Sequence, residues 1–182
     1  EIMDRLVDMQ EEKSNSLMGA GLSKAVVSIV KVQDYDCGTI YEAVNKAVEL
    51  IGGLQDVIKP GSKVFVKINH LSPPSLPERG IVTHPVFAEA VVRLLKTFSN
   101  NITVGDDIPS QSPDGFSISG FQQMCQRAGV RLVNLREGGF VEVGCNGHFL
   151  DKIYLSRIAL DAAVAVNLPH LQTHSLTILT GG

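Results

Sequence analysis

Cysteine is scarce in this 182-residue chain, and its scarcity excludes several kinds of metal site. The three cysteines, Cys37, Cys125 and Cys145, are odd in number and far apart, and no Cys-x-x-Cys pair occurs. The chain therefore encodes neither a zinc knuckle nor an iron–sulfur ligand run. Isolated thiols are typical of a reducing compartment. We expect a cytoplasmic protein that holds no iron–sulfur cluster with ligands of its own.

Long apolar runs and basic patches are also absent. No apolar run approaches the roughly 20 residues that a membrane-spanning helix needs. Residues 1–16 are charged throughout and lack the apolar centre of a signal peptide. The net charge is −3, and no basic patch is interleaved with aromatic residues. We therefore expect no membrane partner and no nucleic-acid partner, which leaves a small-molecule ligand as the expected partner and a homo-oligomer open.

The length favours a single domain preceded by a short arm. Residues 1–22 predict an amphipathic helical arm, with Ile2, Leu6 and Met9 on one stripe. Residues 23–182 predict one α/β domain. The chain stops at Gly182 without a closing helix, so we expect this domain to be truncated at its carboxyl end.

Apolar, β-branched runs alternate with helical patterns along residues 23–182. This alternation predicts a three-layer α/β fold, in which helices flank a mostly parallel sheet. The runs are too uniformly apolar for half-exposed strands, so we expect them to be parallel neighbours in one sheet. The main predicted strands are residues 26–31, 63–68, 102–105 and 162–167, with a further strand at 130–135.

Start and stop signals mark the helices between these strands. Apolar residues at helical spacing over 40–51 predict a helix that stops at Gly52-Gly53. Pro85 suits the first turn of a second helix, capped by Thr83 or His84. Gly129 stops a third helix over residues 121–128.

A small antiparallel hairpin is expected as an insertion. Asn146-Gly147 is a strong hairpin-turn signal, and Phe140–Val143 and His148–Leu150 flank it. A last helix–strand unit is expected over Ile153–Val166.

Polar side chains follow the predicted strands at the point where each strand ends. In open α/β sheets, ligands bind in the crevice outside the carboxyl strand ends. Because parallel strands deliver their trailing residues to the same edge, we expect these side chains to line one cavity. They are Lys67, Asn69, Thr83, His84, Asp106, Asn167 and His174.

Several of these residues have a structural interpretation beside the functional one. Lys67 is either solvated at the rim or directed at an anionic ligand as a point charge. Asn69 either bridges backbone groups of its loop or contacts the substrate. His84 either caps the helix that begins at Pro85 or forms an anion site there with Thr83.

Asp106 and His174 are the candidates for proton transfer. Asp106 and Asp107 are adjacent, so at most one of them faces the crevice directly. His170 and His174 are four residues apart, share a side of the chain in a helix or a strand, and form a candidate metal pair. Structural histidines are the alternative for both, and we expect His174 to matter most for binding.

These motifs together resemble the domain-of-unknown-function 362 family, whose members are often labelled iron–sulfur cluster-binding proteins. The resemblance runs from about Val26 to Gly182. It implies an α/β domain with a rim site and no established reaction. Ile68 stands where the family has proline, and His170 and Gln172 stand where it has lysines, so two positive charges are lost. The motifs that carry the resemblance are Lys67-Ile68-Asn69, Thr83-His84-Pro85, Gly105-Asp106 and Asn167-Leu168-Pro169 with Thr173-His174.

Three functions remain open from the sequence. The first is an enzyme acting on a small anionic or carbonyl-bearing substrate, with or without a divalent metal. The second is a redox or electron-transfer protein whose iron–sulfur clusters lie in a missing segment or a partner. The third is a binding or scaffold module. The chain lacks a dinucleotide fingerprint, a Walker loop and a Gly-x-Ser-x-Gly elbow, so NAD, ATP hydrolysis and serine-hydrolase chemistry are unsupported.

Overall fold

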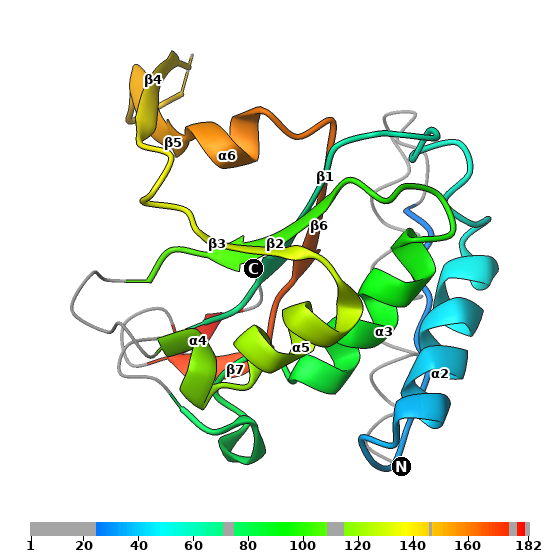
Figure 1. Cartoon of the computed structure of the whole chain (residues 1–182). Helices are drawn as coiled ribbons and strands as arrows, with labels where there is room; N and C mark the ends of the chain where they lie inside the picture. Colours follow the sequence, from blue (N-terminus) through cyan, green and yellow to red (C-terminus); the bar gives the residue numbers. More distant parts are fainter. Residues whose placement is uncertain (1–24, 71–74, 109–114, 146, 175–177, 181–182) are drawn as a thin grey trace, which may run out of the picture.

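Four parallel strands form the central sheet of the computed structural model, which describes residues 25–70, 75–108, 115–145, 147–174 and 178–180. The strand order is β3-β2-β1-β6 (Figure 1). The strands are β1 (Val64–Ile68), β2 (Ile102–Asp106), β3 (Arg131–Asn134) and β6 (Val164–Leu168). Every neighbouring pair is parallel, so the predicted α/β class is confirmed. The predicted arm at residues 1–22 lies outside the described residues.

One face of the sheet is covered by three helices, α2 (Cys37–Leu50), α3 (Pro85–Leu95) and α5 (Phe121–Ala128) (Figure 1). The side chains of Val64 and Val66 point to this face, because alternate residues of a strand share a side. They are buried against Val92 and Leu95 of α3, together with Phe121 of α5. This layer is the main hydrophobic core of the described chain.

The other face of the sheet has a smaller core. Phe65 and Val133 are buried there against Ile158 and Ala162, which lie in and just after the short helix α6 (Arg157–Leu160). Along β6 the exposed and half-buried residues alternate, because helices cover only one of its faces. The second layer is therefore thinner than the first among the described residues.

The predicted helix boundaries are confirmed where a cap or a stop signal marks them. The start of α2 is an exception, because the helix begins at Cys37 and not at the predicted residue 40. There the Asp36 carboxylate accepts hydrogen bonds from the backbone N–H groups of Gly38 and Thr39 and caps the helix. Gly52 and Gly53, with φ of 100° and 84°, follow the end of α2, a conformation that favours glycine. The other confirmed boundaries are the cap of α3 at His84 and the stop of α5 at Gly129.

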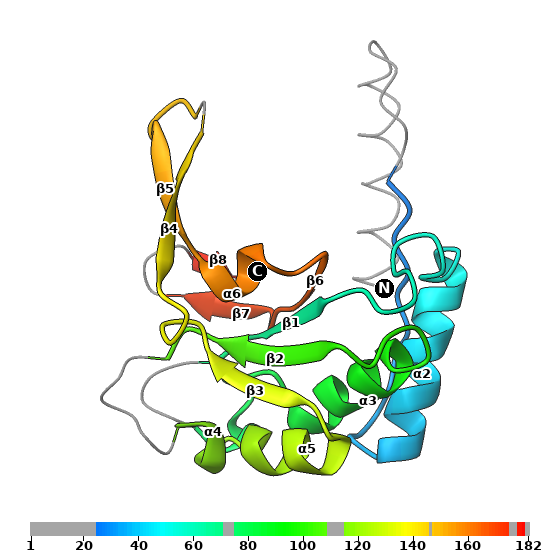
Figure 2. The same ribbon diagram turned by 45° about the horizontal axis from the view of Figure 1, so that its top comes forward.

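The expected hairpin forms, but the prediction placed its second strand at the wrong residues. Strand β4 (Phe140–Gly144) pairs with β5 (Lys152–Ser156), and the two project from the body of the molecule (Figure 2). Residues 148–150 lie in the connection instead. In the helix–strand unit expected over Ile153–Val166, the start of the helix is wrong, because residues 153–156 belong to β5 and α6 has only four residues. Ile153 lies opposite Val143, which keeps the apolar side chains of both strands on one side.

Four further short elements surround the sheet edge and were not predicted. Two three-residue strands follow β6 and pair in an antiparallel sheet. They are β7 (Gln172–His174) and β8 (Ile178–Thr180), and the helices are α4 (Gly115–Ile118) and the 3₁₀ helix η1 (Pro77–Arg79).

The predicted first strand, residues 26–31, is not part of the sheet. The segment instead runs along the length of α2 (Figure 2). Its contact with α2 includes a hydrogen bond from Ser28 Oγ to the carbonyl oxygen of Ala47 at 2.7 Å. The β-branched sequence does favour an extended chain, but β2 and β6 already occupy both edges of β1. In the described part of the chain, no helix is both long enough and apolar enough to cross a membrane.

Candidate functional site

Lys67 and Asp106 meet where β1 and β2 end. Lys67 Nζ lies 3.2 Å from Asp106 Oδ1 and also donates to the carbonyl oxygen of Ile68 at 3.2 Å. The Lys67 side chain is 43% exposed, whereas that of Asp106 is 9% exposed. Gly105 is the register partner of Lys67, and the backbone of β3 approaches it so closely that a Cβ there would collide with the Val133 carbonyl oxygen. Glycine is therefore required beside Lys67.

The Asp106 carboxylate is held by three donors. Its Oδ2 accepts the backbone N–H of His70 at 2.7 Å, and its Oδ1 accepts the backbone N–H of Asp107 at 2.9 Å in addition to Lys67. A carboxylate that accepts this many hydrogen bonds is fixed in one orientation. These contacts support a role in holding Lys67 and the ends of β1 and β2.

His70 lies away from the rim, in the core beside the loop that follows β1. It is buried, and its Nε2 lies 2.9 Å from Ser119 Oγ and 3.2 Å from the Gly115 carbonyl oxygen. Its ring makes an edge contact with Phe116. The histidine thus links the β1 loop to α4.

Thr83 and Asn69 brace the same edge through backbone contacts. Thr83 Oγ1 donates to the Leu168 carbonyl oxygen at 2.6 Å and accepts the Asn69 N–H at 2.8 Å. Thr83 N–H donates to the Asn69 carbonyl oxygen at 2.9 Å, and Asn69 Nδ2 donates to the Ile81 carbonyl oxygen at 3.0 Å. The hydroxyl proton of Thr83 and one amide proton of Asn69 are therefore committed to structure.

His84 combines helix capping with a stacked ring. Its Nδ1 accepts the backbone N–H of Val86 at 3.3 Å, so the neutral ring carries its proton on Nε2. The ring stacks on Tyr35, with centroids 3.7 Å apart and planes 14° apart. Burial lowers the pKa of His84, and the opposing effect of Glu78 is smaller. The imidazole is therefore mainly neutral near pH 7.

A cavity of about 340 Å³ lies at the carboxyl end of β1 and β6, on the helix-covered side of the sheet. Three of the residues singled out from the sequence line it: Thr83, His84 and His170. His170 Nδ1 is buried and has no hydrogen-bond partner among the described residues. The remaining lining residues are mostly apolar and are Val32, Gln33, Asp34, Tyr35, Ile40, Phe87, Pro169 and Leu171.

The predicted site residues therefore share one sheet edge without sharing one cavity. Asn167 is the register partner of Lys67, so both side chains lie on the sheet face opposite to the helices. Neither residue lines the cavity of His84 and His170, and nor do Asn69 and Asp106. For Lys67 and Asn167 the physical reason is the pleat of the strands, which sends successive side chains to opposite faces.

The predicted metal pair is only half within the described residues. The backbone of His174 belongs to β7, but the structure does not describe its side chain. The binding of a metal ion by His170 and His174 together therefore stays a prediction. Over the described ranges, no group of three or more histidine, cysteine, aspartate or glutamate side chains could hold a metal ion.

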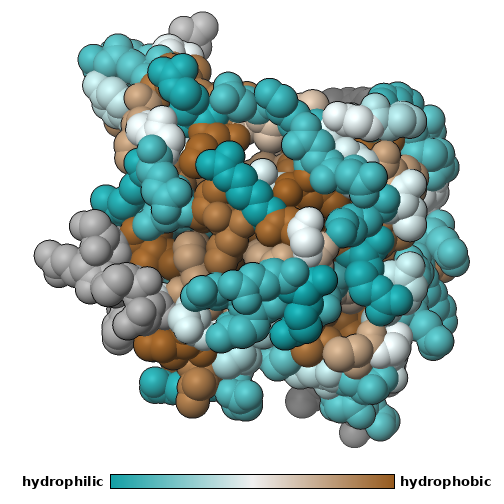
Figure 3. Space-filling view, viewed as in Figure 1, coloured by the Kyte–Doolittle hydropathy of each residue, from teal (hydrophilic) through white to brown (hydrophobic). Residues whose placement is uncertain are grey.

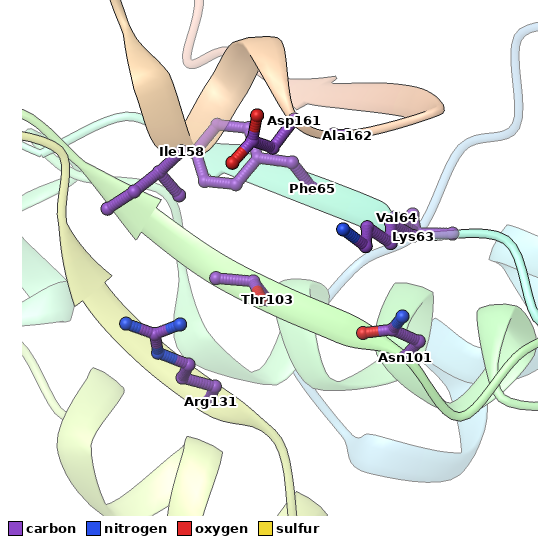
Figure 4. A pocket seen from close by; sticks show the side chains of 9 residues that line it. All are labelled: Lys63, Val64, Phe65, Asn101, Thr103, Arg131, Ile158, Asp161 and Ala162. Atoms are coloured by element: carbon purple, nitrogen blue, oxygen red, sulfur yellow. The ribbon is translucent and has the colours of Figure 1, made fainter. Parts of the chain in front are cut away.

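A second cavity, of about 190 Å³, opens at the amino ends of the strands and was missed from the sequence. Figure 4 shows Phe65 lying below Asp161 and beside Ile158, with Lys63 to the right and Arg131 at the lower left. Figure 3 shows hydrophobic residues gathered in the hollow between α6 and the strands β2 and β3. Lys63 directly precedes β1, and Arg131 is the first residue of β3. A charged residue at the start of an apolar run is the sequence signal that could have located this cavity.

Comparisons with known proteins assign the chain to a family. No solved structure matches the chain. The thylakoid-associated protein sll1697 of Synechocystis sp. is 28% identical over 157 residues, which are 86% of this chain and 48% of that protein. The chain thus spans about half the length of the curated relative it matches. The model of the domain of unknown function DUF362 matches residues 64–182, a range that includes all four strands of the central sheet. The chain therefore belongs to the DUF362 family.

Proposed function

We propose that the carboxyl edge of the sheet binds a small organic molecule in the cavity between His84 and His170. The observation that carries the proposal is the cavity itself, which has about 340 Å³ and lies just beyond the carboxyl ends of β1 and β6. Ligand sites of α/β sheets occur at this edge. Small-molecule sites are also typically lined by apolar side chains with a few polar groups that fix orientation.

The polar groups of the lining favour a ligand with a carbonyl or carboxylate group. The neutral His84 ring carries its proton on Nε2, which is a hydrogen-bond donor. His170 Nδ1 lacks a partner among the described residues and can donate or accept according to its tautomer. Phe87 and Ile40 offer apolar contacts for the body of the ligand. Two imidazoles at one cavity also suit proton transfer, so we propose an enzyme rather than a passive binding module.

Lys67 provides a positive charge at the same edge of the sheet, on the face opposite to the helices. Asp106 compensates its positive charge at 3.2 Å, which weakens the attraction of Lys67 for a distant anion. The third N–H of the ammonium group has no partner among the described residues. Lys67 and Asn167 are thus a second place where an anionic group of a substrate could bind, and Asp106 acts by positioning Lys67.

Thermal unfolding with a panel of short 2-oxo acids and 2-hydroxy acids tests the proposal. A ligand at about 100 times its Kd stabilises the native state by about 2.7 kcal/mol. For a chain of this size, that corresponds to a rise in Tm of roughly 5–10 °C. We expect at least one compound to produce such a shift, and His170→Gln and His84→Gln to abolish it.

Lys67→Gln is the matched control for the two histidine variants. Because Lys67 lies on the other face, its replacement should reduce the shift of charged compounds only. A shift that survives in both histidine variants would remove the cavity as the binding site, and the absence of any shift over the panel would remove the proposed ligand class.

The alternative function, a redox or electron-transfer protein, needs ligands for an iron–sulfur cluster that lie outside the described residues. Cys125 is buried in α5, while Cys37 and Cys145 belong to other parts of the chain, so no contact among them favours a cluster. Iron and acid-labile sulfide analysis of the purified chain tests this alternative. A divalent metal at His170 and His174 is tested by metal titration of the same sample.

We further propose a cytoplasmic location for the protein. The isolated thiols support it. The name of the Synechocystis relative records an association with thylakoids, which a protein can achieve by binding a membrane surface. Fractionation of cells into soluble and membrane pools separates the two locations.

A further inference from the structure

The segment of residues 25–31 exposes β-branched side chains to an unusual degree, and we call it the exposed strand. Val26, Val27 and Ile29 are 74%, 77% and 85% exposed. Removing apolar side chains of this size from water favours association. Val27 and Ile29 share one face of the extended segment, and Val26 is exposed beside them. Apolar side chains gathered within four residues mark an interaction surface more strongly than scattered exposed residues do.

The backbone of the exposed strand lacks main-chain partners in the described part of the chain. None of its N–H or carbonyl groups makes a main-chain hydrogen bond to another described residue. The segment runs along α2, to which the bond from Ser28 to Ala47 ties it (Figure 2). A row of unpaired N–H and carbonyl groups on an extended chain is a template for a further strand.

We propose that the exposed strands of two copies of this chain pair as an antiparallel ribbon and form a two-fold symmetric dimer. The sequence is complementary to itself in a register centred on Ser28. Val27 then lies opposite Ile29 of the second copy, and Val26 lies opposite Val30. Lys31 lies opposite Ala25, so no like charges face each other across the ribbon. A two-fold axis requires this kind of self-complementary patch.

The pleat of the strand selects this register over its neighbours. Because side chains alternate between faces, a shift by one residue would place Val27 of one copy opposite Ser28 of the other. In the centred register, the outward side chains of both copies lie together on one face. Ser28 and Val30, which are half-buried, stay on the α2 side in both copies.

The hairpin tip offers the main competing surface and provides the control. Phe149 is 97% exposed and the adjacent Leu150 is 59% exposed, and both lie in the connection between β4 and β5. The main-chain groups of these two strands already pair with each other. The exposed strand therefore offers apolar side chains together with main-chain groups that lack partners among the described residues, whereas the hairpin tip offers exposed apolar side chains beside strands that are already paired.

Light scattering after size-exclusion chromatography of the full chain measures the assembly. We expect a mass of twice 19.6 kDa for the unmodified chain. Ile29→Pro removes an N–H that the ribbon needs, and it removes no main-chain hydrogen bond to a described residue. This variant should therefore be a monomer with an unchanged far-ultraviolet circular dichroism spectrum. Ile29→Val keeps the β-branched side chain and the N–H and should remain a dimer.

Hydrogen exchange locates the interface. In an antiparallel ribbon alternate N–H groups point to the partner strand, so the amides of Val27 and Ile29 should exchange slowly in the unmodified chain. The Val27 amide should exchange fast in Ile29→Pro. Phe149→Ser should leave the dimer intact. A monomeric unmodified chain at the highest soluble concentration overturns the proposal. So does a dimer that persists in Ile29→Pro, a dimer lost in Phe149→Ser, or a dimer in which the amides of Val27 and Ile29 stay unprotected.

Discussion

Thr83 ties the loop before α3 to the end of β6, because its Oγ1 donates to the Leu168 carbonyl oxygen at 2.6 Å across 85 residues of sequence. The same oxygen accepts the Asn69 N–H. One buried hydroxyl thus joins the ends of β1 and β6, the two strands that border the cavity of His84 and His170. The position of the cavity wall depends on these two hydrogen bonds of Thr83.

Thr83→Val should destabilise the protein by about 1–3 kcal/mol, because the isosteric side chain leaves a buried carbonyl oxygen and a buried N–H without their partner. Thr83→Ser keeps the hydroxyl and should cost less. Urea unfolding of the two variants measures the difference. Equal stability of Thr83→Val and the unmodified chain would contradict the bracing role.

Asp106→Ala should be far more destabilising than Lys67→Met. Removing the carboxylate leaves the backbone N–H groups of His70 and Asp107 without an acceptor, for which we expect a loss of about 3 kcal/mol or more. Removing the half-exposed ammonium leaves both of those bonds in place and should cost about 1 kcal/mol or less. Chemical denaturation provides both values, and a larger loss in Lys67→Met would reverse the roles assigned to the pair.

The stability of the protein should fall as the pH drops below 6.5, in part through His84. Burial lowers the pKa of this imidazole in the folded state below its ordinary 6.5. The unfolded chain therefore binds the proton more readily, and stability present above pH 6.5 is lost as the pH falls toward the folded pKa. His84→Gln should show a shallower dependence of Tm on pH over this window. A titration of the His84 ring by NMR that gives a pKa above 6.5 would reverse the sign.

Iodoacetamide should distinguish the cysteines by burial. Burial raises the pKa of the Cys125 thiol to about 12, with a further contribution from Glu89. The reactive thiolate is therefore scarce in the folded state. Cys37 is exposed and should be modified first. Peptide mapping by mass spectrometry should find modified Cys125 only after denaturation, and rapid modification in the native protein would contradict the packing of α5.

Local patterns in the sequence determined most of the central sheet and the helix ends. The apolar runs at 63–68, 102–105 and 162–167 correspond to β1, β2 and β6, because strands covered by helices need continuous apolar side chains. Asp36 and Gly52-Gly53 set the ends of α2 through local capping and positive φ, which depend on neighbouring residues only. The polar residues at the carboxyl edge were found for the same reason, since they follow the strands directly.

Tertiary structure decided which of these elements pair and which side chains meet. The run at 26–31 has the composition of a strand, but no composition can specify that β2 and β6 take both edges of β1. The rim residues divide between two faces because the register of Lys67 with Asn167 and the position of α3 set their directions. Tyr35 stacks on His84 although 49 residues separate them in sequence, and no local pattern encodes such a contact. Strand pairing and side-chain packing join residues far apart in the sequence, so they depend on the free energy of the whole chain and not on that of any one segment.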